Sequence, residues 1–541
     1  MARLAQLSVE LHNEILRHAL HYSRRPSQYS TPREPRMEWI DKPRDRAGFP
    51  FNAALTYSLW RDILACIPEC WTRLVFDVTT DPTPILSAFK WSNSLPEISV
   101  LVFTSATKSA QVDKDLEKKR VEAIVNGLQP HIPRSSSIVV DVMHETSLPS
   151  SLIFFAQDAP DLIELTLKFC EAEREVNDEI YRSRIKAFQV PDPKLATSFP
   201  RLLRVKMYGL GLLELCMFDG AHEWLKELKT YQYLDLHLAH FRFLDEFQYD
   251  DCITVAEFAE SLSSLRHLRY LHLQDIGLEC TFPPIPELAF LGSDFLHELD
   301  LLELHFEDVS RDFLSEFFEN ATCYGRQTTF TRCAIPRISQ AVYCSTLDLD
   351  SIIADEEINE DGSRENSFHR VLVGWSGLDL TIRSCPSFND DLLQWLGREV
   401  EYTPFRLLSE EPFKAEPIVY FTSSREEPLK TFPAESLTSL TIDNCENFSF
   451  EQLRRFAEVR LNASAQEGID HHELNPERGD TVKGELRHLI LCGRHPKFTR
   501  RDVEWINTGT ITMSYPSDGY ADAVNSLDMS VIFTSGRFWN W

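Results

Sequence analysis

The sequence LTSLTI at residues 437–442, which Cys445 follows, decides the fold. The same phrase recurs as LIELTL at residues 162–167, with Cys170 at the corresponding distance. In both segments apolar and variable residues alternate over the last four positions, which is the pattern of a β-strand that buries one face. Each phrase therefore predicts a strand that places its Leu and Ile side chains in a core and its variable side chains on an open face.

The rest of the chain repeats this order of residues in seven more segments: 202–207, 231–236, 268–273, 296–301, 344–349, 377–382 and 486–491. Segments with helical periodicity lie around and between them, at 112–128, 176–188, 254–265, 313–318, 392–400 and 453–459. Thr254 and Glu257 have the spacing of a capping box at the start of one such helix. Parallel strands joined by helices cannot bury their apolar faces singly, so we expect stacked units that share one continuous core.

The order Leu-x-x-Leu-x-Leu-x-x-Cys resembles the leucine-rich repeat, in particular the Cys-ended kind found behind F-boxes. The resemblance implies an α/β solenoid with parallel strands on a concave face and helices on a convex face. Successive phrases are 28 to 60 residues apart in this chain, whereas regular repeats run about 20 to 29. We therefore expect an irregular solenoid over residues 76–541, with loops near 348–361 and 463–484 and a packed C-terminal cap. A doubly wound sheet is the competing architecture, but no glycine-rich turn accompanies the nine strand phrases.

The N-terminal segment, 1–75, differs from the rest of the chain by charge. It holds 11 Lys+Arg and 8 Asp+Glu, a net of +3, whereas the whole chain of 541 residues has a net charge of −28. Such an acidic chain repels phosphate backbones and anionic lipid, so we expect no nucleic-acid or membrane partner. No C-x-x-C pair occurs among the 12 cysteines, and no run of about 18 apolar residues exists. These features predict free thiols, no bound metal or other cofactor, and a cytoplasmic or nuclear location.

Within this N-terminal segment, the spacing of Leu7, Leu11 and Ile15 predicts a short amphipathic helix. A Pro- and Arg-rich insert at 23–48 predicts a loop, and apolar residues at every fourth position over 55–67 predict a second helix.

Two stretches of this segment resemble the halves of an F-box: LSVEL at 7–11, followed by Ile15, and WRDI at 60–63 with IPECW at 67–71. The resemblance implies a helical module over residues 1–75 that docks on the Skp adaptor of Skp/cullin/F-box ubiquitin ligases. A bundle that exposes an apolar stripe can give that stripe to a partner. The residues implied in adaptor binding are Leu7, Val9, Leu11, Ile15, Trp60, Ile63, Pro68 and Trp71. The alternative is a small helical subdomain that only seals the larger fold.

The variable residues of the strand phrases are expected on the open face, where a protein substrate could bind. In the later phrases these residues are mostly acidic, which favours a basic protein segment as the partner, with tyrosines as aromatic anchors. The candidates for this substrate face are Tyr233, Asp235, Tyr270, His272, Glu298, Asp300, Asp348 and Asp350. A solvated sheet surface without a ligand is the alternative interpretation.

The sequence offers no complete catalytic or metal-binding motif. The segment 357–368 begins like a calcium loop but has Phe368 where a bidentate Glu is needed. GWSG at 374–377 is one residue short of a nucleophile elbow, and His471 and His472 are adjacent, which suits neither a helix nor a strand that holds a metal. We therefore expect a non-catalytic protein: a substrate-recognition subunit of a Skp/cullin/F-box ligase or, alternatively, a leucine-rich-repeat-like scaffold with no ligase role.

Overall fold

A computed structural model describes the chain over residues 7–23, 48–105, 112–171, 194–216, 218, 220–244, 253–279, 297–336, 342–353, 355, 357–358, 364–373, 375–402, 429–467, 486–496, 499, 501–502, 505 and 512–514. The chain forms two compact units. The first contains Met1–His240 and Ser264–Leu268, and the second contains Phe241–Ser263 and Arg269–Trp541. Both units are mixed α/β structures with a mostly parallel sheet. The sequence-based border at residue 75 stays a prediction.

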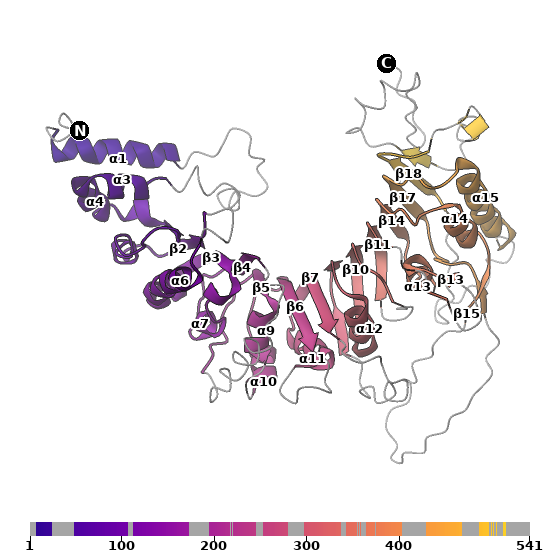
Figure 1. Cartoon of the computed structure of the whole chain (residues 1–541), viewed down its shortest axis with the longest axis horizontal. Helices are drawn as coiled ribbons and strands as arrows, with labels where there is room; N and C mark the ends of the chain where they lie inside the picture. The colour runs from indigo at the N-terminus through magenta and orange to yellow at the C-terminus, as the bar shows by residue number, and fades with distance from the viewer. Residues whose placement is uncertain are drawn as a thin grey trace, which may run out of the picture. The chain divides into compact units, whose positions relative to one another are not determined.

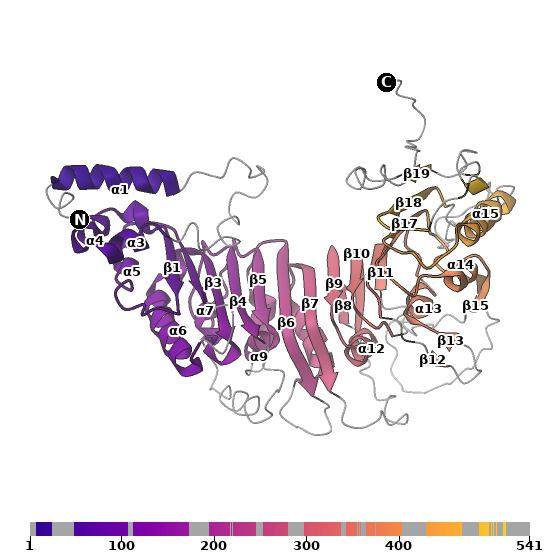
Figure 2. The same ribbon diagram turned by 45° about the horizontal axis from the view of Figure 1, so that its top comes forward.

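The first unit starts with helices and continues into parallel strands. Figure 1 shows α6, α7 and α9 on one side of these strands, and Figure 2 shows the strands in sequence order. The elements are α1 (Val9–Ser23), α3 (Phe51–Thr56), α4 (Ser58–Ala65), η2 (Pro68–Trp71), β1 (Arg73–Asp77), α5 (Ala88–Trp91), β2 (Ile98–Phe103), α6 (Lys114–Leu128), η4 (Gln129–Arg134), β3 (Ser135–His144), η5 (Glu145–Ser147), α7 (Leu152–Phe155), β4 (Glu164–Glu171), β5 (Arg204–Tyr208), α9 (Gly209–Cys216), α10 (Ala221–Glu227) and β6 (Leu234–Leu244), whose last residues belong to the second unit.

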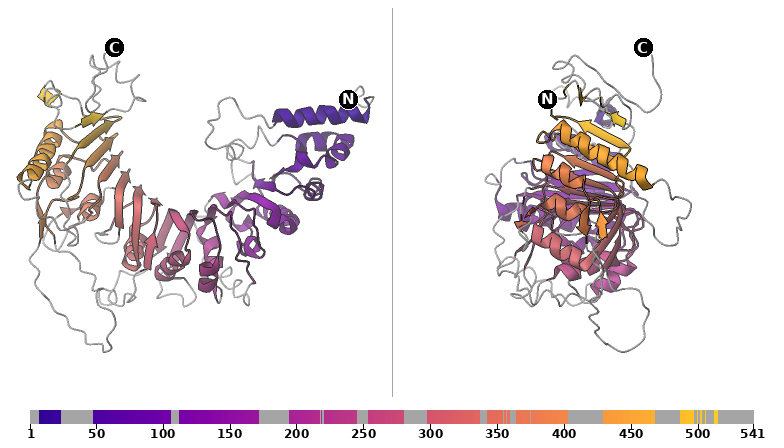
Figure 3. Two further views of the ribbon diagram at one scale, coloured as in Figure 1. Left: turned by 180° about the vertical axis from the view of Figure 1, so that it is seen from behind. Right: turned by 90° about the vertical axis from the view of Figure 1, so that its right-hand side faces the viewer.

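The second unit has the same alternation of strands and helices, and Figure 3 shows its helices on one side of its strands. In the sheet, β7, β9, β10, β11, β14, β17, β18 and β19 follow one another, and β8 also pairs with β10. The elements are α11 (Val255–Ser264), β7 (Leu268–Glu279), β8 (His297–Asp300), β9 (Glu303–Glu307), α12 (Arg311–Asn320), β10 (Ala321–Thr331), β11 (Val342–Asp350), β12 (Glu357–Ile358), β13 (Arg364–Glu365), α13 (Ser367–Leu372), β14 (Asp379–Arg383), α14 (Asp390–Leu396), β15 (Val400–Tyr402), β16 (Leu429–Thr431), β17 (Ser439–Asp443), α15 (Phe450–Glu467), β18 (His488–Cys492) and β19 (Thr512–Ser514).

The strands of the second unit end in a recurring turn. The residue after the strand has a left-handed backbone at Asp308 (φ 53°), Ser351 (φ 52°) and Ser384 (φ 50°). Its N–H donates to the last carbonyl of the next strand, for example from Ser351 to Arg383 at 2.8 Å. Single residues in this conformation end a strand sharply. The turn therefore redirects the chain from each strand toward the helix layer in the same way.

A buried residue follows this turn, and at three strands it is a cysteine: Cys333, Cys385 and Cys445. The thiol of each donates to the carbonyl of the residue two positions earlier, at 3.3, 3.0 and 3.4 Å. The predicted role of Cys445 at the end of its strand is confirmed. The predicted equivalence with Cys170 is wrong, because Cys170 lies inside β4 and is exposed, with its thiol 3.8 Å from Asp141 Oδ1. No disulfide occurs among the cysteines in the described ranges.

Side-chain caps start several helices where the sequence has Asp, Ser, Asn or Thr. Asp113 accepts from the N–H of Leu116 at the start of α6, and Asn389 accepts from that of Leu392 at the start of α14. The predicted capping box before α11 is confirmed, since Thr254 Oγ1 accepts from the Glu257 N–H at 3.0 Å and the Glu257 carboxylate accepts from the Thr254 N–H at 2.9 Å.

Four sequence-based predictions fall on residues that the structure does not describe: most of the insert at 23–48, the helix at 176–188, most of the loop at 463–484 and the C-terminal cap. Among the described helices, none has the length and hydropathy required to cross a lipid bilayer.

Candidate functional site

The N-terminal helix α1 has one buried and one exposed stripe. His12 and Leu16 are buried, with exposed fractions of 0% and 1%, whereas Leu11 and Ile15 are 51% and 42% exposed. Tyr22 continues the exposed stripe further along the helix and is 66% exposed. We name Leu11, Ile15 and Tyr22 the α1 apolar stripe. Such a stripe on a helix is a surface that another protein can cover.

The buried stripe of α1 is held by α4. Trp60 donates its indole N–H to His12 Nδ1 at 2.9 Å, and the Trp60 and His12 rings lie edge to face with centroids 6.3 Å apart. Tyr57 completes this aromatic group, with its ring centroid 6.1 Å from that of Trp60. Because Trp60 supports α1 directly, its first role is to set the orientation of the α1 apolar stripe.

The other residues implied in adaptor binding divide by exposure. Leu7 and Val9 are exposed, and Pro68 is half-buried at the start of η2. Trp71 is fully buried: its ring packs 5.6 Å from Phe51 and 4.7 Å from Trp91, and its indole N–H donates to the Leu64 carbonyl at 2.8 Å.

Ile63 is also buried. Trp71 and Ile63 therefore pack in the core of the first unit, and their assignment as adaptor-contact residues stays a prediction. The apolar residues at every fourth position over 55–67 do not form one buried stripe, because Leu55 is 58% exposed whereas Ile63 is buried. The expected single helix is two short helices, α3 and α4.

The residues predicted for the substrate face are divided between the two units. In the first unit Tyr233 is exposed and its ring packs 6.2 Å from that of Tyr231. Asp235 accepts from Arg204 at 3.2 Å, on the strand beside it. Its charge is therefore already partly compensated within the unit.

In the second unit the variable side chains of neighbouring strands lie opposite one another in rows. One row runs through His272, His305, Thr329 and Asp348 on β7, β9, β10 and β11. The row beside it contains Gln274, Glu307, Thr331 and Asp350 in the same order of strands. We name these two rows the polar rows.

Several acids of this face are paired. Asp348 accepts from the Gln327 amide at 2.7 Å, and Arg383 lies between Asp350 and Asp443, at 3.8 and 3.1 Å. Asp300 accepts from Arg269 at 2.8 Å, but its side chain remains 80% exposed. The expected acidic surface is thus partly neutralised by its own arginines.

The predicted strand 296–301 occupies a different place from that expected. Glu298 and Asp300 belong to the short strand β8, which pairs with the first residues of β10. The strand between β7 and β10 at the level of the polar rows is β9, so the residue opposite His272 is His305. Tyr270, half-buried, lies opposite Glu303 of β9.

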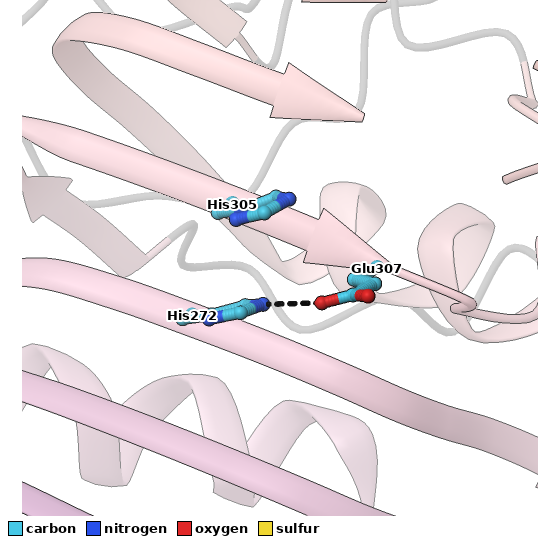
Figure 4. Close-up of side chains that lie close together, drawn as sticks. All are labelled: His272, His305 and Glu307. Carbon is cyan, nitrogen blue, oxygen red and sulfur yellow. Dashed lines mark ion pairs between the residues drawn. The ribbon is translucent and has the colours of Figure 1, made fainter. Parts of the chain in front are cut away.

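His272, His305 and Glu307 form a compact group, which we name the histidine cluster (Figure 4). The two imidazole rings are stacked, with centroids 4.2 Å apart and planes inclined by 9°. His272 Nε2 lies 3.3 Å from Glu307 Oε2, and His305 Nε2 lies 3.0 Å from Thr331 Oγ1. All three residues are half-buried.

Arg332 fixes the carboxylate of the histidine cluster. One of its terminal nitrogens lies 2.5 Å from Glu307 Oε1 and 2.6 Å from Asp308 Oδ2, and its Nε donates to Asp308 Oδ1 at 2.8 Å. The two oxygens of Glu307 are therefore divided between two partners: Oε1 faces Arg332 and Oε2 faces His272. A charge-assisted pair of this kind sets the orientation of the carboxylate.

Burial lowers the pKa of His305, against the opposing effect of Glu307, whose charge raises it. The nearby Arg332 also lowers this pKa, and Asp348 and Asp350 raise it. A lowered pKa favours the neutral imidazole, which is both a hydrogen-bond acceptor and a metal ligand.

Sequence reasoning named His272 but missed His305, Glu307 and Tyr22. His305 and Glu307 lie directly after LLEL at 301–304, and their alternation with Leu304 and Phe306 is the signal that could have identified β9. Of the three weak motifs rejected from the sequence, the paired His471 and His472 lie outside the described residues.

A comparison of the chain with protein-family models found no match, and a comparison with curated proteins found none either.

Proposed function

We propose that this protein is a substrate-recognition subunit of a Skp/cullin/F-box-type ubiquitin ligase, which docks on the Skp adaptor through α1 and presents a protein substrate on its sheet. The observation that carries the proposal is the α1 apolar stripe: Leu11, Ile15 and Tyr22 face outward while His12 and Leu16 on the same helix are buried. An amphipathic helix packed by one stripe and exposed by another is suited to helix-in-groove binding.

Two further features support this docking mode. The hydrogen bond from Trp60 to His12 holds α1 in one orientation, so little conformational entropy is lost when a partner covers the stripe. The net charge of +3 in the N-terminal segment 1–75 is complementary to an acidic adaptor surface, which increases the rate of encounter.

The sheet supports the substrate half of the proposal. The recurring strand, turn and helix of the second unit favour a repeat array of the leucine-rich-repeat type, in which the polar rows would form the recognition surface. Exposed Glu303 and Asp379 lie on the same face as the polar rows and favour a basic substrate segment. Such a subunit needs no catalytic residue, because it raises the effective concentration of a substrate lysine near the conjugating enzyme.

A non-ligase scaffold is the second candidate. It is favoured by the burial of Ile63 and Trp71, which makes α4 and η2 part of a core that continues into β1. In that case the N-terminal helices only seal the end of the first unit.

Co-expression of the full chain with a Skp-type adaptor and a cullin, followed by affinity purification and gel filtration, tests the proposal. The parent chain should co-elute with both partners, and Leu11→Asp with Ile15→Asp should abolish co-elution. Leu116→Asp is the matched control, since Leu116 is a comparably exposed leucine on α6. A parent chain that elutes alone would support the scaffold, and co-elution of the α1 variant would refute docking through α1.

A further inference from the structure

The histidine cluster combines the ligand types that a divalent transition metal prefers. Two imidazoles and one carboxylate are a common set of protein ligands for zinc, and all three ligand atoms lie within 4.8 Å of one another. Among the described residues, this is the one group of at least three His, Cys, Asp or Glu side chains with such spacing. We propose that His272, His305 and Glu307 form a binding site for a zinc-class divalent cation, with one ring nitrogen of each histidine and Glu307 Oε2 as ligands.

The backbone positions these ligands without any loop. His272 and His305 lie directly opposite one another on β7 and β9, and Glu307 is two residues after His305, so all three side chains leave the same face of the sheet. Ligands that project from paired strands are held more precisely than ligands on a loop.

One distance between ligand atoms already matches metal coordination. Two ligand atoms of a tetrahedral zinc ion with zinc–nitrogen distances near 2.05 Å are about 3.3 Å apart, and His272 Nε2 already lies 3.3 Å from Glu307 Oε2. The stacked rings, inclined by 9°, direct their nitrogen lone pairs nearly parallel. One ring must therefore rotate to share an ion, which the broad χ2 well of histidine permits.

Arg332 has the role of an outer partner that orients a ligand. It binds Glu307 Oε1 and leaves Oε2 directed at His272, which favours monodentate coordination by Oε2. Asp348 and Asp350 add negative charge near His305 without being in the cluster, and they oppose the positive charge that Arg332 brings.

The direct test is a titration of the metal-free, tag-free full chain with Zn²⁺ in competition with a chromophoric chelator near neutral pH. The parent should bind one tight equivalent. His272→Ala, His305→Ala and Glu307→Gln should each remove it, and Arg332→Gln should weaken it by about 10- to 100-fold, as loss of an outer partner does at other metal sites. His488→Ala is the matched control, because His488 is an exposed histidine on β18 of the same unit and should leave the affinity unchanged.

A second measurement needs no variant. Cu²⁺ or Co²⁺ bound to the parent chain should show the paramagnetic resonance couplings of two imidazole nitrogens and no thiolate charge-transfer band.

Three results would overturn the site: full stoichiometry and affinity in a folded His272→Ala/His305→Ala double variant, thiolate ligation, or the absence of binding by the parent. Because none of these readouts involves an adaptor, the result is independent of the proposed ligase function.

Discussion

Replacement of Leu11 and Ile15 by Ala should weaken adaptor binding without affecting the fold. Complete burial of a Leu or Ile side chain contributes about 1.5 to 3 kcal/mol, and these two residues are 51% and 42% exposed. If the adaptor covers the exposed half of each side chain, each contributes about 1 kcal/mol to the binding free energy, or about 2 kcal/mol for both. The double variant should therefore bind the adaptor about 30-fold more weakly.

The neighbouring stripe provides the contrast. Substitutions at exposed positions usually change the free energy of unfolding by less than about 0.5 kcal/mol, so the Leu11→Ala/Ile15→Ala variant should unfold in urea like the parent. Leu16→Ala, at a residue only 1% exposed, should cost about 2 to 5 kcal/mol. Calorimetric titration of purified adaptor into each folded variant measures the binding loss. Equal adaptor affinity of the parent and of Leu11→Ala/Ile15→Ala would refute the reasoning.

Three further predictions concern the core and its titratable groups. Trp71→Ala should lower the free energy of unfolding in urea by about 3 to 5 kcal/mol, because it empties a fully buried site and removes the indole hydrogen bond to the Leu64 carbonyl; an unchanged midpoint would contradict its place in the core. Burial raises the pKa of Cys385 to about 12, so iodoacetamide at pH 8 should label exposed Cys66 and leave Cys385 intact until the chain unfolds, as read by mass spectrometry. Burial lowers the pKa of His305, so the unfolded chain binds the extra proton and stability should fall as pH drops below about 6.5. His305→Gln should show a smaller fall in melting temperature over this window, and an identical pH profile would exclude this contribution.

Local sequence patterns predicted the strands that carry strong apolar alternation. Five of the predicted strand segments correspond to β4, β5, β14, β17 and β18, and the helical patterns at 112–128 and 254–265 correspond to α6 and α11. These segments were predictable because one face of each is buried along its whole length, which imposes alternation on the sequence. The helix predicted at 453–459 is longer, Phe450–Glu467, since its polar later turns carry no periodic signal.

Other elements depended on contacts that no local pattern contains. β10 was missed because the polar residues Thr322 and Thr328 occupy buried positions where an apolar side chain is expected, although pairing with β9 and β11 completes its backbone hydrogen bonds. On α1 the adjacent pairs Leu11/Ile15 and His12/Leu16 are both at helical spacing. The pair His12/Leu16 is the buried one, and the bond from Trp60 to His12, formed across 48 residues, joins it to α4.

The type of each candidate surface was predictable from the sequence, whereas the residues that form it were less so. The exposed apolar residues of α1 and the polar character of the sheet face were expected, but the histidine cluster was not. Its two histidines are far apart in the sequence, and they meet only because β7 and β9 pair in one register.

Hydrogen–deuterium exchange of the full chain, alone and with a saturating amount of purified Skp-type adaptor, tests the central claim most directly. The account predicts that amides of α1 (Val9–Ser23) become protected on adaptor addition while those of β9 and β10 keep their rates. Unchanged exchange throughout α1 in the presence of the adaptor would contradict it.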